Sequence, residues 1–373
     1  MFLSFTRRTF LGAAAALVFG AGAAALSAPA LADGHGAKMG DKLKVGFVYV
    51  GPIGDHGWTY QHDKGRLAIE DALGEKVSTT YVESVQEGAD AERVVRQLAQ
   101  DGHDLIFTTS FGFMNPTVKV AKRFPDTKFE HATGYKRSKN VSIYNARFYE
   151  GRYPVGQMVG KMTKSNIIGY IASIPIPEVV RGINATALGL RSVNPDAEIR
   201  VIWVNSWYDP GKEREAAETL IAQGADVIMQ HTDSPAPIQA AEEKGVFAVG
   251  QASDMTRFGP KAHLTAIVDD WNPYYIQRAK DVLDGTWEST DIWGGLDSGM
   301  VRLSAINDVV PAEVKAMVEE TVAKITAKTF HPFTGPIKDQ SGKEVVPAGS
   351  VMDDGALLGM DWYVEGVVGK LPK

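Results

Sequence analysis

The sequence contains no cysteine among its 373 residues. This absence excludes disulfide bonds, thiol catalysis, thiolate metal ligands and the lipid-carrying cysteine of an anchored lipoprotein. A long run of basic residues is missing too, and the formal net charge is −6 at pH 7, which argues against a nucleic-acid partner. Beyond the N-terminal segment, no apolar stretch is long enough to span a bilayer.

The common catalytic motifs are absent as well. Gly51, Gly54 and Gly57 do not form the dinucleotide fingerprint, and Pro52 removes a backbone N–H that a phosphate would need. There is no Walker lysine, no Gly-x-Ser-x-Gly elbow and no HExxH or paired-histidine metal spacing. We therefore expect a protein that is not an enzyme, with no cofactor and no metal.

Residues 1–32 have the features of an export signal. Arg7 and Arg8 lie in a twin-arginine-like pattern, an apolar stretch follows, and Ala30-Leu31-Ala32 forms a small-residue cleavage site before Asp33. A membrane anchor is the alternative, but the stretch is short and a good cleavage site follows it. We expect a periplasmic protein with a cleaved signal and no lipid anchor; the twin-arginine and general secretion routes both stay open.

The stretch from Lys42 to Leu73 predicts a strand, a loop and a helix. Leu43 to Val50 is a Val-rich apolar run, as expected of a central parallel strand buried on both faces. Glycines and Pro52 break the chain after it, and helical spacing of apolar residues follows. Asp55 and Trp58 are then expected in a loop at the carboxyl end of a strand, where ligands bind in open α/β sheets. The alternative is that Trp58 packs on the sheet edge and Asp55 caps the helix.

The same rhythm recurs along the chain and predicts an α/β fold with two lobes. Each lobe is expected to be a doubly wound, mostly parallel sheet, with a ligand cleft between the lobes. Strands of the first series are expected near 77–82, 104–109, 128–132 and 142–148, and those of the second near 166–172, 199–204, 227–230, 247–250 and 265–268. The predicted limits are 43–148 plus about 271–297 for the N-terminal lobe, 149–270 plus about 298–330 for the C-terminal lobe, and 331–373 for a hairpin and tail.

Polar and aromatic residues follow most of the predicted strands. Facing loops of this kind form a cleft that can close on a small molecule, and Trp58 and Trp207 are the natural pair of walls for a flat ring. For Asp233 and Asp254, a helix cap or a turn is an equal and compatible interpretation. The candidate ligand-binding residues are Asp55, Trp58, Phe111, Glu150, Tyr153, Asn205, Trp207, Asp233, Asp254 and Asp269.

Several motifs resemble the basic membrane protein (BMP) or PnrA-like family, the substrate-binding proteins of ABC importers with the type I periplasmic-binding fold. The motifs are Gly54-Asp55-x-Gly57-Trp58, Phe148-x-Glu150-Gly151-x-Tyr153, Trp207-x-Asp209-Pro210-x-Lys212, Val249-Gly250 up to Asp254, Phe333-x-Gly335-Pro336-Ile337 and the run from Met360 to Gly369. The family binds purine nucleosides or other flat heterocycles. The resemblance implies that Trp58 and Trp207 sandwich the base, that Glu150, Asp233 and Asp254 fall at or near polar contact positions, and that the partner is a membrane permease.

Two departures from the family pattern bear on the ligand. Most members are lipoproteins, and this chain has no cysteine. The family often has Lys-Asn after the strand 265–268, where this chain has Asp269-Asp270. An acid accepts an N–H from a bare base, which favours a free purine such as adenine over a nucleoside. The alternatives are another flat heterocycle or a sugar, a periplasmic nucleoside hydrolase, and a sensory protein that docks a chemoreceptor; a monomer is expected.

Overall fold

The computed structural model of the protein describes residues 42–372. The predicted export signal, residues 1–32, and the leader that follows it lie outside the described residues. Among residues 42–372, no helix combines the length and the apolar character needed to cross a membrane.

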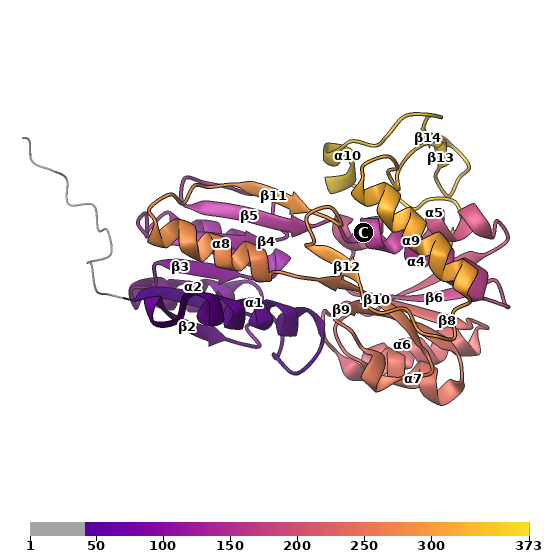
Figure 1. The fold of residues 1–373 in the computed structure, drawn as a ribbon, viewed down its shortest axis with the longest axis horizontal. Helices are drawn as coiled ribbons and strands as arrows, with labels where there is room; N and C mark the ends of the chain where they lie inside the picture. The colour runs from indigo at the N-terminus through magenta and orange to yellow at the C-terminus, as the bar shows by residue number, and fades with distance from the viewer. Residues whose placement is uncertain (1–41, 373) are drawn as a thin grey trace, which may run out of the picture. The chain divides into compact units, whose positions relative to one another are not determined.

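The first lobe is built on a six-stranded sheet whose neighbouring strands are all parallel, in the order β11-β5-β4-β3-β1-β2. The strands are β1 (Leu43–Val48), β2 (Val77–Val82), β3 (Leu105–Thr108), β4 (Lys128–Ala132), β5 (Val141–Ala146) and β11 (Asp291–Gly294). Helices α1 (Gly57–Leu73) and α8 (Asn272–Leu283) cover one face, and α2 (Ala89–Gln100) and α3 (Met114–Ala121) cover the other (Figure 1). Alternate residues of a strand point to opposite faces, and helices cover both faces here, so central strand β1 is buried on both sides except at Lys44.

The second lobe is built on a seven-stranded sheet in the order β12-β10-β9-β8-β6-β7-β15. Its strands are β6 (Ile167–Ala172), β7 (Glu198–Trp203), β8 (Val227–His231), β9 (Phe247–Ala252), β10 (His263–Asp269), β12 (Val301–Leu303) and β15 (Val367–Val368), and only β12 is antiparallel to its neighbour. Helices α4 (Phe148–Met162), α5 (Pro177–Val193) and α9 (Ala312–Thr326) lie on one face, and α6 (Pro210–Ala222) and α7 (Ala236–Lys244) on the other (Figure 1). The predicted two-lobed α/β fold is thereby confirmed.

The chain passes between the two sheets three times. It leaves β5 for α4 at Arg147, leaves β10 for α8 at Asp270-Trp271, and returns from β11 to β12 through residues 295–300. Short 3₁₀ turns η1 (Gly74–Lys76), η2 (Phe111–Phe113) and η3 (Thr256–Phe258) join other elements. The residue limits that we predict for each lobe stay a prediction.

The C-terminal tail packs on the second lobe. It holds the hairpin β13 (Ile337–Lys338) and β14 (Glu344–Val346), helix α10 (Asp354–Leu358) and edge strand β15. Asn184 of α5 anchors the tail by donating to the carbonyl of Trp362 at 2.7 Å and accepting from the N–H of Val364 at 3.1 Å. Asp354 accepts two hydrogen bonds of 2.7 Å from Arg147, so the tail also contacts the first crossing between the sheets.

A difference from the sequence-based prediction concerns Trp58. The structure places it second in helix α1 rather than in the preceding loop. Gly57 begins the helix with φ at +79°, a left-handed conformation that glycine adopts without steric cost, so the chain turns into the helix sooner than its glycine content suggests. Trp58 therefore lies on a rigid element.

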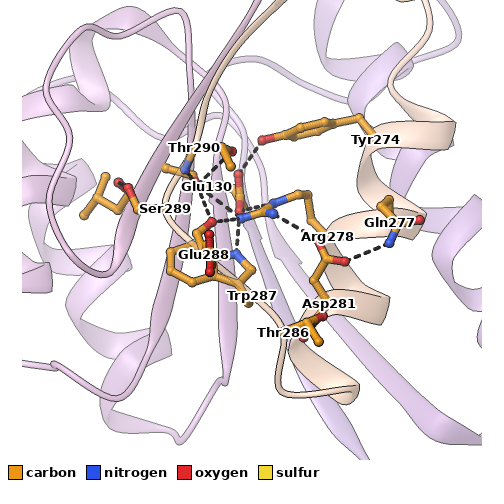
Figure 2. A network of polar contacts seen from close by, with 12 residues as sticks. Glu130, Tyr274, Gln277, Arg278, Asp281, Thr286, Trp287, Glu288, Ser289 and Thr290 are labelled. Carbon is orange, nitrogen blue, oxygen red and sulfur yellow. Dashed lines mark hydrogen bonds and ion pairs between the residues drawn. The ribbon is translucent and has the colours of Figure 1, made fainter.

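Helix α8 and the segment after it are tied to the first sheet by a buried polar network (Figure 2). The carboxylate of Glu130 on β4 accepts hydrogen bonds of 2.7 Å from Tyr274, Arg278 and Trp287. Arg278 also donates to Asp281 at 2.9 Å and to the carbonyl of Glu288 at 2.6 Å. Because each charge is paired and hydrogen-bonded, the network can stay buried and fix the segment after the second crossing.

Replacing Glu130 with alanine tests the importance of this network. The Glu130→Ala variant leaves Arg278 buried without its main counter-ion, and we expect the free energy of unfolding to fall by about 3–5 kcal/mol. Urea unfolding followed by circular dichroism measures the change. Glu243→Ala removes one partner of the exposed ion pair with Arg214 and should have little effect. An equal, small loss in both variants would contradict a structural role for the network.

Candidate ligand-binding site

A cavity lies between the two lobes at the carboxyl ends of their parallel strands. The first lobe contributes Val50, Trp58, Ser110, Phe111 and Thr133, and the second contributes Glu178, Trp207, His231, Asp233 and Gln251. The cavity and its mouth enclose about 370 Å³ of space not filled by protein atoms. The crevice at the carboxyl ends of the strands is where open α/β sheets bind their ligands.

Aromatic rings from both lobes form the walls of the cavity. The indole N–H of Trp58 donates to the carbonyl of Thr109 at 2.6 Å, which fixes the ring plane. Behind it, His62 and Trp271 pack against Trp58 edge-to-face, with centroid distances of 4.3 and 5.6 Å. Phe111 and Trp207 line the same space, the latter from the second lobe. The site therefore offers aromatic surface from both sides of the cleft.

Two carboxyl groups line the cavity. Asp233 follows β8 and accepts a hydrogen bond from the backbone N–H of Trp58 at 3.3 Å. Burial and the negative charge of Glu213 raise the pKa of Asp233 to about 8, against the lowering effect of that N–H. Glu178 lies in the first turn of α5, 3.7 Å from the ring of His231. Burial lowers the pKa of His231, so the imidazole is neutral near pH 7 and does not neutralise Glu178.

Asp269 lies at the end of β10, fully buried and outside the cavity lining. Neither carboxylate oxygen has a hydrogen-bond partner within residues 42–372. Burial raises its pKa well above the usual range, and the nearby charges of Asp233 and Glu178 add to the effect. The inner end of the cleft thus holds several acids, and the buried arginines Arg152 and Arg181 lie close enough to attract Glu178.

The lobes touch directly at the rim of the cavity. The N–H of Gly57 donates to Ser253 Oγ at 2.7 Å, and Arg257 donates to the carbonyl of Asp55 at 2.8 Å while pairing with its carboxylate. A Cβ atom on Gly57 would lie 2.7 Å from the carbonyl oxygen of Asp233, so only glycine permits this approach.

Four of the ten predicted site residues line the cavity: Trp58, Phe111, Trp207 and Asp233. Trp58 and Trp207 are far apart in the sequence, yet both line this cavity. They meet because each follows the carboxyl end of a parallel strand or begins the next helix, and these ends face one another.

Three other predicted residues lie near the rim or in an adjoining groove. Asp55 is exposed and pairs with His56 and Arg257. Asp254 accepts from the N–H and hydroxyl of Thr256 at 2.8 and 2.6 Å, which is the turn-closing role that the sequence also allows. Asn205 is exposed, in the groove next to Trp207.

The remaining three lie outside the cavity lining: Asp269, described above, and Glu150 and Tyr153 on α4. Glu150 accepts a hydrogen bond from the N–H of Leu296 at 2.8 Å and so joins the first and third crossings. Tyr153 packs against Phe330 with ring centroids 5.0 Å apart. Direct ligand contact by any of these three residues stays a prediction.

Glu178 and Gln251 are lining residues that the sequence analysis does not select. Glu178 looks like an ordinary acid in the first turn of a helix, and Gln251 lies inside a strand among apolar residues. Two features of the sequence could have marked them as candidates: Gln251 comes just after Val249-Gly250, and Glu178 comes soon after the end of β6. Within residues 42–372 there is no group of three or more His, Asp or Glu side chains able to hold a metal.

Comparison with known proteins agrees with this architecture. Residues 42–332 match the family model described as "ABC transporter substrate-binding protein PnrA-like". A purine-binding protein of Brucella abortus is 59% identical over 340 residues, covering 91% of this chain and 97% of the relative. A putative ABC transporter glucose-binding protein of Haloferax volcanii is 41% identical, covering 91% of this chain and 84% of the relative.

Solved structures support the fold. A solute-binding protein of an ABC transporter system from Aeropyrum pernix K1 superimposes with a TM-score of 0.68 at 21% identity, covering 84% of this chain and 95% of the other. At this identity the likeness shows the fold alone. Together with the family match, it confirms the resemblance noted in the sequence: the chain belongs to the PnrA-like (Bmp) family of ABC transporter substrate-binding proteins.

Proposed function

We propose that the protein captures a purine between its lobes and delivers it to the permease of an ABC importer. The observation that carries the proposal is the cavity itself, with aromatic walls from both lobes and carboxyl groups beside them. The name of the Brucella abortus relative, a purine-binding protein at 59% identity, supports the same ligand class. The role is binding and delivery rather than catalysis.

Aromatic stacking gives this arrangement its selectivity for a flat ring. Each stacked aromatic pair contributes about 0.5–1.5 kcal/mol beyond the area that it buries. A ligand that touches Trp58 and Trp207 contacts both lobes, so its affinity is higher when the lobes are together. That difference in affinity is what drives a two-lobed protein to close on its ligand.

The acidic side chains around the cavity, whose oxygens accept hydrogen bonds, favour a free base such as adenine over a nucleoside. The lining residues include Glu178 and Asp233 but no lysine or arginine, and Asp269 lies deeper in the cleft. Carboxylate oxygens accept hydrogen bonds, and a free purine has a ring N–H that a nucleoside replaces with its sugar.

A sugar is the second candidate. Its supporting observation is the 41% identical Haloferax volcanii relative, named as a putative glucose-binding protein. Indole faces and carboxylates also suit sugars, so calorimetry with glucose belongs in the same experiment. Another flat heterocycle is a third ligand class with the same stacking requirement.

We further propose that the protein acts in the periplasm as a monomer, after removal of residues 1–32. The absence of cysteine leaves no site for a lipid anchor at the cleavage point. Mass analysis of the exported protein reads the new N-terminus directly.

Isothermal titration calorimetry tests the ligand. We expect adenine to bind more tightly than adenosine, because the nucleoside loses a ring N–H and adds a sugar that meets no basic residue in the cavity lining. Glucose should give no heat of binding. Adenosine binding equal to or tighter than that of adenine would reject the preference, and binding of glucose alone would reject the purine.

Removing one wall tests the stacking. Trp58→Ala should weaken adenine binding at least tenfold, since it removes the stacking face and the hydrogen bond to Thr109. Calorimetry gives the affinity, and a thermal melt shows whether the fold survives. The control is Trp287→Phe, at a tryptophan of the Figure 2 network that is not part of the cavity lining; this variant should leave affinity unchanged. Unchanged affinity in Trp58→Ala would remove the stacking role.

The raised pKa of Asp233 predicts a pH dependence of stability in the ligand-free protein. Because its pKa rises from 3.8 in the unfolded chain to about 8 in the folded one, the folded state holds an extra proton between these values. The contribution of Asp233 to stability therefore falls as pH rises from about 4 to 8. Asp233→Asn removes this contribution, so its melting temperature should rise relative to the wild type across that range.

Asp254 supplies a control of opposite sign. Burial alone would raise the pKa of Asp254, but hydrogen bonds from Thr256 outweigh burial and lower the pKa. Its contribution to stability is present at neutral pH and is lost as pH falls through the folded pKa. The melting temperature of Asp254→Asn should therefore fall relative to that of the wild type as pH rises. If the melting temperatures of both variants changed with pH in the same direction relative to the wild type, the opposite pKa shifts of Asp233 and Asp254 would be contradicted.

A further inference from the structure

The lining residue Gln251 has one end of its side chain held and the other end unpaired. It lies in β9 with 2% of its surface exposed. Its Oε1 accepts a hydrogen bond from Arg152 Nη2. Its Nε2 has no hydrogen-bond partner within residues 42–372, and protein atoms do not fully enclose it. Because Gln251 lines the cavity, this nitrogen is open to the cavity.

The orientation of this amide follows from the chemistry of arginine. A guanidinium carries only N–H donors and never accepts. The amide atom that meets Arg152 must therefore be the oxygen, and the amide nitrogen must point the other way. Gln251 thus presents a donor to the ligand, whereas a glutamine free to rotate would offer either a donor or an acceptor.

Arg152 is fixed by its surroundings on α4. It is fully buried, donates to the carbonyl of Gln230 at 2.8 Å and lies over the ring of Tyr170 at 5.3 Å. None of the ion pairs within residues 42–372 includes it. Its Nε and Nη1 have no partner there. Glu178 attracts Arg152 from a distance but makes no hydrogen bond or ion pair with it. Burying a guanidinium without a carboxylate in direct contact is unfavourable, and such local departures from good packing chemistry are typical of functional sites.

We propose that Gln251 donates its amide N–H to a ring nitrogen of the purine and that Arg152 is the positioning residue that holds the amide in this orientation. The inference rests on the proposed function. A purine base has hydrogen-bond donors and acceptors around its edge, and the oxygens of Asp233 and Glu178 can accept from its donors. Gln251 supplies the complementary donor, so the site distinguishes a ring nitrogen from a C–H at one position.

The test is a chemical double-mutant cycle by calorimetry. Its ligands are adenine and the deazaadenines, in which each ring-nitrogen acceptor is in turn replaced by C–H. The wild type should bind one deazaadenine about 5- to 100-fold more weakly than adenine, because that analogue leaves the buried amide donor unpaired. Gln251→Glu keeps the contact to Arg152 but places an oxygen toward the ligand, and should bring this ratio close to one.

Arg152→Lys tests the positioning role. It keeps the positive charge but loses the planar fork that orients the amide, so the same affinity ratio should shrink while adenine still binds. Gln277→Glu, an exposed glutamine on α8, is the matched control and should keep the wild-type ratio. If Gln251→Glu fails to fold in a thermal melt, Gln251→Met removes the donor with an apolar side chain of similar length and should give the same ratio near one.

The outcomes separate the two proposals. A wild type that binds neither adenine nor any analogue overturns the purine function. A wild type that binds adenine and every deazaadenine equally well overturns the present inference alone. So does a Gln251 variant that binds adenine and keeps the full wild-type ratio. If Gln251→Glu loses the affinity ratio between adenine and the deazaadenine while Arg152→Lys keeps it, Gln251 remains the donor but Arg152 has no positioning role.

Discussion

The first turn of helix α1 is the point on which the binding site depends. A helix begins with backbone N–H groups that have no partner inside the helix, and α1 has no side-chain cap of its own. The N–H groups of Gly57 and Trp58 donate instead to Ser253 and Asp233 of the second lobe. The contact between the lobes therefore completes the cap of the helix that carries one wall of the cavity. If the lobes separated, the N–H groups of Gly57 and Trp58 would hydrogen-bond to water instead.

Two kinds of buried charge coexist in this molecule, and they differ in how their polar atoms are paired. The pair of Glu130 and Arg278 has its main hydrogen-bonding atoms matched by protein partners, as a structural network requires. Asp269 and Arg152 are equally buried but keep unpaired polar atoms. Arg152 donates to the lining residue Gln251, and Asp269 lies near the charges of the lining residues Asp233 and Glu178. In folded proteins nearly all buried polar groups are paired. Unpaired polar atoms also occur elsewhere in residues 42–372, at His131 and Trp293 for example, so those near the cavity support a site only together with its aromatic lining.

The sequence predicts the fold well because the signals are repeated. Buried parallel strands appear as short apolar runs, each followed by glycine, polar residues and helical spacing. Trp58 and Trp207 are predictable as cavity residues for the same reason, since both follow the carboxyl ends of such runs. Strand β15 is not predictable, because two residues at a sheet edge carry no periodicity.

The polar part of the site is harder to predict from sequence, for physical reasons. Asp55 and Asp233 look alike in sequence, yet one is exposed beside Arg257 and the other is enclosed by the opposite lobe. Gln251 becomes informative only when Arg152, nearly a hundred residues earlier, fixes its amide. Such roles arise from contacts between distant segments, and no local pattern encodes them.

The rigidity of the two walls differs, and this difference bears on how the lobes work together. The indole of Trp58 is backed by His62, which stacks on Trp271 at 4.9 Å with the ring planes 8° apart. Trp271 lies in the second crossing, so this wall is continuous with the first-lobe core and with the connection between the lobes. Trp207 follows β7, and its indole N–H has no partner within the described part of the chain. A ring bound between them therefore adds its contacts to a fixed surface on one side and to a less constrained one on the other. In the closure that we propose, the second lobe would bring its less constrained indole against a prepared first-lobe wall.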